Sequence, residues 1–221
     1  MELSSVSLFQ EISEEEIQSL LKCLGAAEKT YKKGSCIWGE GMVTEQLGVV
    51  LCGRVLLEYS DLWGTNSILG SAGPSAVFGE AYACCPGQPL QISVYAAEDT
   101  TVLFLNVTRV LTLCPNSCSF HFRLVRNLLA VCAQKNLELS RRMQHITPKT
   151  IRGRLLSYFS QCVKQAQSNT FTLPYNRQQL ADHLGVDRSA LCSELSKMQQ
   201  DGLIRYSKRD ISICEEWEEP P

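Results

Sequence analysis

The sequence predicts an α+β protein that consists of an N-terminal β jelly-roll barrel, a long dimerisation helix and a C-terminal winged helix-turn-helix. Three observations predict these parts in this order. Short apolar runs alternate with glycines over residues 31 to 106. Apolar residues recur at steps of 3 and 4 over residues 125 to 146, and a glycine separates two short helical patterns within residues 176 to 200.

The composition is typical of a soluble globular protein, with 44% hydrophobic residues, 20% charged residues and a net charge of -2. A chain of 221 residues can form one large or two ordinary domains. No basic segment followed by an apolar one opens the chain, and no stretch approaches the ~20 apolar residues of a membrane span. We therefore expect a cytoplasmic protein that makes no membrane contact.

The first part of the chain predicts a short helix followed by many strands. Apolar residues at roughly helical spacing predict a helix over residues 8 to 24. From Tyr31 to Asn106, runs rich in Val, Leu, Ile, Phe and Tyr are separated by turn residues about every ten positions. This spacing is typical of a β-sandwich or jelly roll, and the frequency of glycine excludes an all-helical alternative.

Residues 118 to 146 contain no glycine or proline and predict one long helix. Its apolar steps of 4 and 3 are those of a two-stranded coiled coil. The helix would be about 40 Å long, more than one barrel covers, so we infer a homodimer. Asn136 in this seam either pairs with its symmetry mate or faces a ligand. The seam comprises Val125, Leu129, Cys132, Asn136, Leu139, Met143 and Ile146.

Residues 176 to 200, NRQQLADHLGVDRSALCSELSKMQQ, carry the most specific pattern in the chain. Asn176 and Gln179 form a capping-box-like pair at the start of one helix, and Asp187 caps a second helix. Gly185 supplies the turn between them, because glycine adopts positive φ easily. Two such helices form a helix-turn-helix, with a generic helical hairpin as the alternative. The expected buried stripes are Leu180 and Leu184 on the first helix and Leu191, Leu195 and Met198 on the second.

The outward face of the second helix combines small and basic residues, which suits a DNA major groove about 12 Å wide. Arg188, at the helix start, is placed to bind a guanine edge with two hydrogen bonds. Residues 202 to 213 predict a β-hairpin wing whose basic side chains contact phosphates. The candidate DNA contacts are Arg177, Arg188, Ser189, Ser193, Lys197, Arg205, Lys208 and Arg209.

The charge distribution also favours an anionic partner for the C-terminal part. Residues 147 to 210 hold ten Lys or Arg against five Asp or Glu, whereas the first 146 residues hold eleven against fourteen. Thr147 and Pro148 have the form of an N-cap followed by proline at the first helical position. The predicted domains are therefore a β-barrel domain at 1–113, a dimerisation helix at 114–146 and a winged-helix DNA-binding domain at 147–221; the family resemblance described below implies that the first is effector-sensing.

Eleven cysteines are scattered along the chain without a C-x-x-C pair. An odd, dispersed set is not a disulfide framework, and no metal-ligand spacing appears. We expect most of them to be small buried apolar residues. A redox-sensing thiol is the alternative, with Cys84 and Cys85 as the first candidates.

The order of barrel, long helix and winged helix resembles the cyclic-AMP receptor protein and fumarate-nitrate regulator (CRP/FNR) family of bacterial transcription regulators, over nearly the whole chain. The glycine frame from Lys33-Gly34 to Phe78-Gly79-Glu80 is similar to its sensor barrel. The segment from Asp187 to Ile204 is similar to its DNA-binding helix. The resemblance implies an effector-responsive homodimer that binds a palindromic operator, with RNA polymerase as a candidate partner. It also implies an effector pocket between the barrel and the long helix, which reorients the DNA-reading heads through the hinge.

The sequence departs from this family where effectors bind. Cyclic-AMP binders carry an Arg-Ser or Arg-Thr pair at the position of Leu90 and Gln91, so we expect that cyclic AMP is not the effector. The N-terminal cysteine cluster of the iron-sulfur sensors is missing, and the barrel region contains no histidine for haem. One DNA-side departure is Ser193, where many relatives place arginine, so we expect a different operator sequence.

The remaining lining predicts a neutral or weakly polar small molecule, of unknown identity, as effector. Asn127 is a further candidate to close the pocket. Glu80 has an alternative role as a cap for backbone N–H groups. The candidate effector contacts are Phe78, Gly79, Glu80, Ala81, Leu90, Gln91, Ile92, Cys132 and Asn136.

Catalysis is not expected. Jelly-roll metalloenzymes need two or three histidines and a carboxylate inside the barrel, whereas His121, His145 and His183 all lie outside it. No nucleophile triad, phosphate-binding loop or dinucleotide motif appears, and no motif identifies a cofactor. The alternatives left open are a thiol-redox sensor of the same fold and a constitutive DNA-binding dimer with a degenerate sensor.

Overall fold

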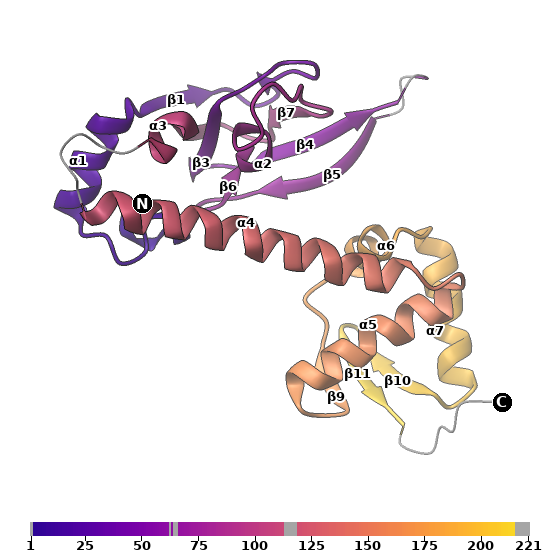
Figure 1. Ribbon diagram of the computed structural model, residues 1–221. Helices are drawn as coiled ribbons and strands as arrows, with labels where there is room; N and C mark the ends of the chain where they lie inside the picture. The colour runs from indigo at the N-terminus through magenta and orange to yellow at the C-terminus, as the bar shows by residue number, and fades with distance from the viewer. Residues whose placement is uncertain (1, 62, 64–65, 113–118, 215–221) are drawn as a thin grey trace. The chain divides into compact units, whose positions relative to one another are not determined.

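The computed structural model describes residues 2–61, 63, 66–112 and 119–214 (Figure 1). The chain divides into two compact units, residues 1–134 and 135–221. The division falls inside one continuous helix, α4 (Ser119–Ile146), between Gln134 and Lys135. Each unit has its own hydrophobic core.

The N-terminal segment contains two single 3-10 turns before its helix. These are η1 (Leu3–Ser5) and η2 (Ser7–Phe9), and the helix is α1 (Glu14–Leu24). The prediction of a helix from residue 8 was therefore wrong at its start. Ser13 and Glu16 form a capping box that fixes the first turn at Glu14. Leu8 and Ile12 are buried, as their apolar spacing suggested, but they precede the helix.

The first unit contains two four-stranded antiparallel sheets, which confirms the predicted sandwich. The strands are β1 (Ala27–Tyr31), β2 (Cys36–Trp38), β3 (Gln46–Cys52), β4 (Val55–Ser60), β5 (Asn66–Ala72), β6 (Val77–Phe78), β7 (Ser93–Ala96) and β8 (Thr100–Asn106). One sheet has the order β1-β8-β3-β6 and the other the order β2-β7-β4-β5. Their inner faces are apolar, because Val, Leu and Phe side chains alternate inward along the strands.

Two glycines let the sandwich close tightly around aromatic rings. Gly79 adopts φ 75 between β6 and the short helix α2 (Glu80–Ala83), and a Cβ there would lie 2.3 Å from the Trp38 ring. A Cβ on Gly48 of β3 would lie 2.4 Å from the Phe78 ring. Any side chain at either position would displace a buried ring. The helix α3 (Val107–Leu111) then follows β8.

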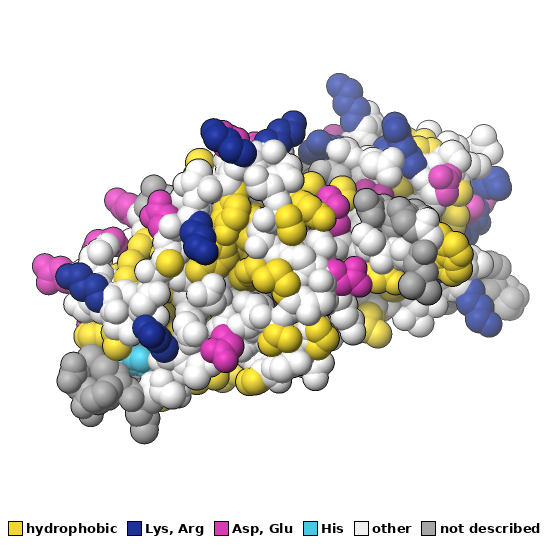
Figure 2. Space-filling view, turned by 90° about the horizontal axis from the view of Figure 1, so that it is seen from above, with side chains coloured by type: hydrophobic (Ala, Val, Ile, Leu, Met, Phe, Trp, Pro, Cys, Tyr) yellow, Lys and Arg dark blue, Asp and Glu magenta, His cyan; other side chains and the backbone are white. Residues whose placement is uncertain are grey.

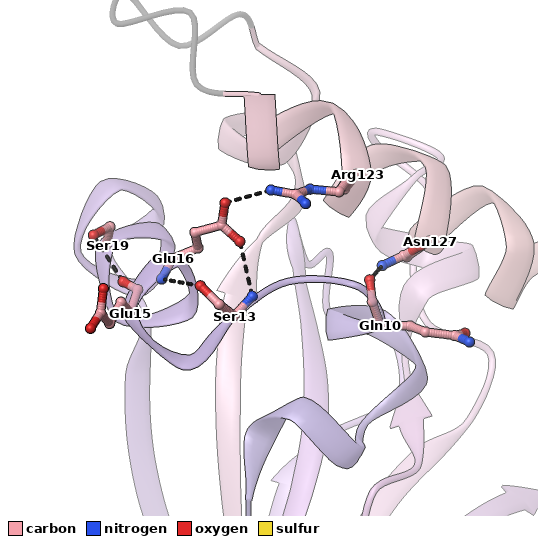
Figure 3. Close-up of polar contacts among 7 residues, drawn as sticks. All are labelled: Gln10, Ser13, Glu15, Glu16, Ser19, Arg123 and Asn127. Atoms are coloured by element: carbon pink, nitrogen blue, oxygen red, sulfur yellow. Dashed lines mark hydrogen bonds and ion pairs between the residues drawn. The ribbon is translucent and has the colours of Figure 1, made fainter.

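The first half of α4 is anchored to the N-terminal segment by polar contacts (Figure 3). Arg123 is ion-paired with Glu16 of the capping box, and Arg126 is ion-paired with Glu11. The buried amide of Asn127 donates hydrogen bonds to the carbonyl oxygens of Leu8 (3.1 Å) and Gln10 (2.7 Å). The Asn127 amide therefore ties α4 to the backbone of the N-terminal segment.

The second unit is a helix-turn-helix with a three-stranded sheet. Its core is formed by Leu155, Phe159, Leu180, Leu191 and Leu195, among others. The sheet has the order β10-β11-β9 and is antiparallel. The elements are α5 (Ile151–Ala166), β9 (Thr170–Thr172), α6 (Arg177–Leu184), α7 (Arg188–Gln200), β10 (Ile204–Ser207) and β11 (Asp210–Ile213).

The start of α5 differs from the prediction. Thr150, not Thr147, is its N-cap, and the Thr150 hydroxyl accepts a hydrogen bond from the Gly153 N–H at 3.0 Å. Pro148 lies before the helix, where its carbonyl accepts a hydrogen bond from Arg154. The Thr147 hydroxyl instead donates a hydrogen bond back to the Met143 carbonyl of α4 at 2.7 Å, so Thr150 caps the first turn of α5.

The fold class is confirmed as mixed α and β, with an antiparallel β-sandwich, one long helix and a winged helix-turn-helix. Within the described ranges, every helix is too short or too polar to cross a bilayer. Hydrophobic side chains lie between charged ones over the face drawn in Figure 2.

Candidate nucleic-acid interface

The helix-turn-helix is fixed by the caps that its sequence predicts. The Asn176 side chain accepts a hydrogen bond from the Gln179 N–H, and the Gln179 side chain accepts one from the Asn176 N–H, each at 2.9 Å. Gly185 adopts φ 62 in the turn. Asp187 caps α7 by accepting hydrogen bonds from the N–H groups of Ser189 (2.8 Å) and Ala190 (3.0 Å). These local contacts set the angle at which α7 leaves the turn.

The outward face of α7 carries four of the candidate DNA contacts. Arg188, Ser189, Ser193 and Lys197 are all exposed. The Ser189 hydroxyl donates a hydrogen bond to the Asp187 carboxylate at 2.5 Å. That bond is the largest of several contacts that lower the pKa of Asp187. This face therefore presents the Arg188 cation at the first turn of α7 and small serine side chains nearby. The neighbouring Asp187 carboxylate is hydrogen-bonded to the N–H groups that begin the helix.

Two further residues of that face are less available. Cys192 is half-buried. The Ser196 hydroxyl lies 3.3 Å from the Tyr206 hydroxyl of the wing and also donates to the Cys192 carbonyl at 3.0 Å. Ser196 therefore connects α7 to the wing.

The predicted wing is confirmed as the hairpin β10–β11, with the tip at Lys208 and Arg209. Arg205, Lys208 and Arg209 are exposed on it. Arg177, at the start of α6, is held differently. Its guanidinium donates a hydrogen bond to the Lys208 carbonyl at 2.9 Å and lies over the Tyr206 ring at 5.0 Å. Arg177 therefore braces the wing against α6, and its role as a DNA contact remains a prediction.

Three arginines stabilise the helix-turn-helix through contacts that no local sequence pattern predicts. Arg154 donates to the carbonyls of Leu184 (2.9 Å) and Gly185 (3.0 Å), and Arg142 donates to the two carbonyls that precede them. Arg152 is ion-paired with two carboxylates of the α7 region. Their partners lie about 30 to 50 residues away in the sequence, so no local pattern reveals them.

A buried aromatic and polar cluster lies at the C-terminal end of α4. His145 is hydrogen-bonded to Ser157 at 3.1 Å and to Gln161 of α5. The His183 ring of α6 lies 5.0 Å from the Tyr175 ring and 5.3 Å from the Tyr158 ring. Burial is the main cause that lowers the pKa of His183, with Arg142 and His145 adding to it. The last turn of α4 is thereby packed directly on the helix-turn-helix.

The predicted effector contacts of the first unit differ in how far they are buried. Phe78, Glu80 and Leu90 are buried, whereas Ala81 and Gln91 are exposed. Leu90 belongs to the apolar core of the sandwich. The Gln91 N–H donates to the Tyr82 hydroxyl at 3.4 Å, which places the end of this loop beside α2. Ile92 is partly buried against the same core, and Gly79 makes the turn described above.

Cys132 of α4 lies beside Cys84 in the same unit, and both pack on the core that includes the N-terminal segment. Burial, followed by Cys132, raises the pKa of the Cys84 thiol to about 11. Cys85 is exposed. Asn136 is exposed on α4 and accepts a hydrogen bond from the Ser140 hydroxyl at 3.4 Å.

The seam of α4 contains apolar side chains that the chain itself leaves uncovered. Leu129 is 69% exposed, Leu139 is 60% exposed and Met143 is 57% exposed. They occupy three positions of the repeat that predicted a coiled coil, whereas Val125 and Cys132 of the same repeat pack against the core of the first unit.

Two regions of the chain match known domain families. Residues 28–117 match the cyclic nucleotide-binding domain, and residues 153–216 match the Crp-like helix-turn-helix domain. Among curated proteins, the chain is similar to the cyclic AMP receptor protein of Thermus thermophilus. The two are 23% identical over 214 residues, which cover 94% of this chain and 92% of that protein.

Solved structures share the fold over nearly the whole chain. CprK complexed with OCPA has a TM-score of 0.66 at 16% identity, and the match covers 90% of this chain and 89% of that one. A CooA variant from Carboxydothermus hydrogenoformans has a TM-score of 0.58 at 19% identity, with coverage of 95% and 91%.

Proposed function

The chain belongs to the CRP/FNR family of transcription regulators, and on this premise we propose that it is an effector-controlled homodimer that reads a palindromic operator. Members with this helix-turn-helix are DNA-binding regulators with a sensor domain. The proposal adds the dimer, the operator symmetry and the kind of effector.

The observation that carries the proposal is the outward face of α7. Arg188, Ser193 and Lys197 are exposed on it, whereas the neighbouring acidic groups are occupied. Asp187 accepts hydrogen bonds at the helix start, and Glu194 is ion-paired with Arg152. With Glu194 engaged by Arg152, the exposed Arg188 and Lys197 can present their cations to phosphates and to base edges.

The uncovered seam of α4 supports a homodimer. Its apolar side chains follow the coiled-coil repeat, so a second copy of the same helix would bury them symmetrically. Two copies of α7 would then meet two half-sites of an operator that shares the protein's two-fold symmetry.

The lining of the sensor supports an effector without a cyclic phosphate. The chain contains no lysine or arginine between Arg54 and Arg109, a range that includes β6, α2 and the loop to β7. Leu90 is buried in the sandwich core and Gln91 is uncharged. A phosphate bound there would have no cationic partner from this segment, which makes a neutral or weakly polar ligand the better fit.

The test is a selection of bound duplexes from a random library, run with and without cell-extract metabolites. We expect a palindromic motif with half-site centres about 10 base pairs apart. Enrichment that depends on the extract would support an effector, whereas identical enrichment would favour the constitutive alternative. Indifference to every duplex at low ionic strength would refute the proposal.

A further inference from the structure

One flank of α7 carries two carboxylates that share a single cation. Glu194 and Asp201 are seven residues apart, so two helical turns place them on the same side. Arg152, in the first turn of α5, reaches both. Its Nε lies 2.6 Å from Glu194 Oε1, and its Nη2 lies 2.7 Å from Asp201 Oδ2. The guanidinium thus spans from the middle of α7 to its C-cap.

These two ion pairs fix the rotation of α7 about its own axis, which the apolar contacts alone leave adjustable. Leu191, Leu195 and Met198 determine which face of α7 is buried, but apolar packing is non-directional. A planar guanidinium that binds two carboxylates has directional geometry and resists rotation of the helix about its own axis. The Glu194 side chain is only 18% exposed, so this pair is partly shielded from solvent.

Helix rotation matters because base recognition tolerates little misplacement. Binding groups need to be held within about 0.5 Å and 10–20° of their productive geometry. Arg188 and Ser193 project from α7 on sides other than the clamped flank, and their directions change with any rotation of the helix. The Arg152 cation also offsets one of the two negative charges of Glu194 and Asp201, which would otherwise repel phosphates near the reading face.

We propose that Arg152 is a positioning residue for sequence reading: through Glu194 and Asp201 it sets the orientation of α7 in the groove, without touching DNA itself. The inference rests on the proposed reading of DNA by α7. It gives Arg152, a residue of α5, a role in the sequence discrimination that α7 performs.

The test compares the affinities of purified full-length variants for the selected operator and for a scrambled duplex, over a range of salt concentrations. Arg152→Gln is expected to lower the ratio of specific to non-specific affinity about tenfold, the scale of one impaired base contact. The salt slope should stay within about 0.5 of wild type, because a lost phosphate contact would reduce it by about 1. Arg152→Lys should recover only part of the affinity ratio, because the ammonium keeps the positive charge but cannot form the same planar fork. Lys164→Gln, which removes an exposed charge from the same helix, is the matched control and should keep the ratio of wild type.

If Arg152→Gln fails to fold, as judged by circular dichroism, Glu194→Gln provides a second test. This substitution removes one of the two carboxylates that Arg152 binds, together with its negative charge. Non-specific affinity should therefore rise slightly while the specificity ratio falls. An unchanged ratio in either folded variant, or a slope reduced by about 1 in Arg152→Gln, would overturn the inference. Failure of the wild-type protein to bind any duplex would instead refute the proposed function.

Discussion

The Arg142 guanidinium donates a hydrogen bond to the Asp182 carbonyl, with 3.0 Å between Nη2 and the oxygen. Its Nε also donates to the His183 carbonyl at 3.3 Å. Arg154 binds the next two carbonyls, so two cations lie at the C-terminal end of α6. The last carbonyls of a helix lack internal partners and carry partial negative charge, which favours cations there. Because Arg142 belongs to α4, the last turns of that helix are tied to the helix-turn-helix.

Arg142→Gln is therefore expected to lower the free energy of unfolding by about 1–2 kcal/mol, the scale of a lost charge-assisted hydrogen bond. Urea unfolding measures the change. Arg141→Gln is the matched control, because Arg141 is the exposed neighbour on the same helix. Equal losses in the two variants would show that the contacts of Arg142 add nothing to stability.

Arg188 and Arg209 are expected to contribute to DNA binding in different ways. Arg188→Ala should cost about 1–3 kcal/mol at one base position and relax specificity there. Arg209→Ala should weaken all duplexes alike and reduce the salt slope by about 1. Arg209 is preferred to Lys208 because the backbone of Lys208 has φ 53, which a substitution could disturb. Binding of single-base operator variants separates the two effects, and a uniform loss in Arg188→Ala would contradict its assigned role.

The reading elements were predictable because their signals are local. The Asn176–Gln179 box, the left-handed Gly185 and the Asp187 cap each act within four residues, and all were found as predicted. The run without glycine or proline likewise predicted the long helix, which the structure describes from Ser119 to Ile146. Two helix starts were predicted wrongly. Ser13, not the apolar spacing, begins α1 at Glu14, and Thr150 rather than Thr147 begins α5.

The rest depended on contacts between distant segments. Strand β9 has only three residues and exists because it pairs with β11 about 40 residues later. Arg142, Arg152 and Arg154 look like ordinary solvated charges in the sequence, since their partners lie on other helices. Asn127 was expected at a ligand pocket, but the backbone of the N-terminal segment takes its hydrogen bonds. Pairing between polar groups that are far apart in the sequence follows no periodic pattern, so the sequence alone does not predict it.

Stability should depend on pH through His183. Its pKa is lowered below 6.5, so the folded state favours the neutral ring while the unfolded chain protonates first as the pH falls. Stability is therefore lost as the pH falls from about 6.5 towards the folded pKa, and this contribution is constant above about 6.5. Urea unfolding between about pH 5 and pH 8 should show a loss on the acid side that His183→Gln reduces. An identical pH dependence in that variant would contradict the assignment.

Cys84 is expected to be a slow nucleophile. With a pKa of about 11, only about one thiol in a thousand is ionised at pH 8, whereas the thiolate is the reactive form. Iodoacetamide should therefore label the exposed Cys85 faster. Because the two residues are adjacent, the rates are measured by mass spectrometry on Cys84→Ser and Cys85→Ser separately. If DNA binding responds to peroxide, the response should disappear in Cys85→Ser, and equal labelling rates in the folded protein would refute the prediction.

The dimer prediction is tested on α4 by two leucines of similar exposure. Leu139 is 60% exposed and lies in the seam, whereas Leu137 is 53% exposed and lies outside it. Leu139→Gln removes an apolar contact worth about 1.5–3 kcal/mol from each protomer, so the dimer dissociation constant should rise at least about a hundredfold. Leu137→Gln should leave it nearly unchanged, because that side chain faces away from the coiled-coil seam. Sedimentation velocity over a concentration series measures both constants. A wild-type protein that stays monomeric throughout, or equal effects of the two substitutions, would exclude this seam as the dimer interface.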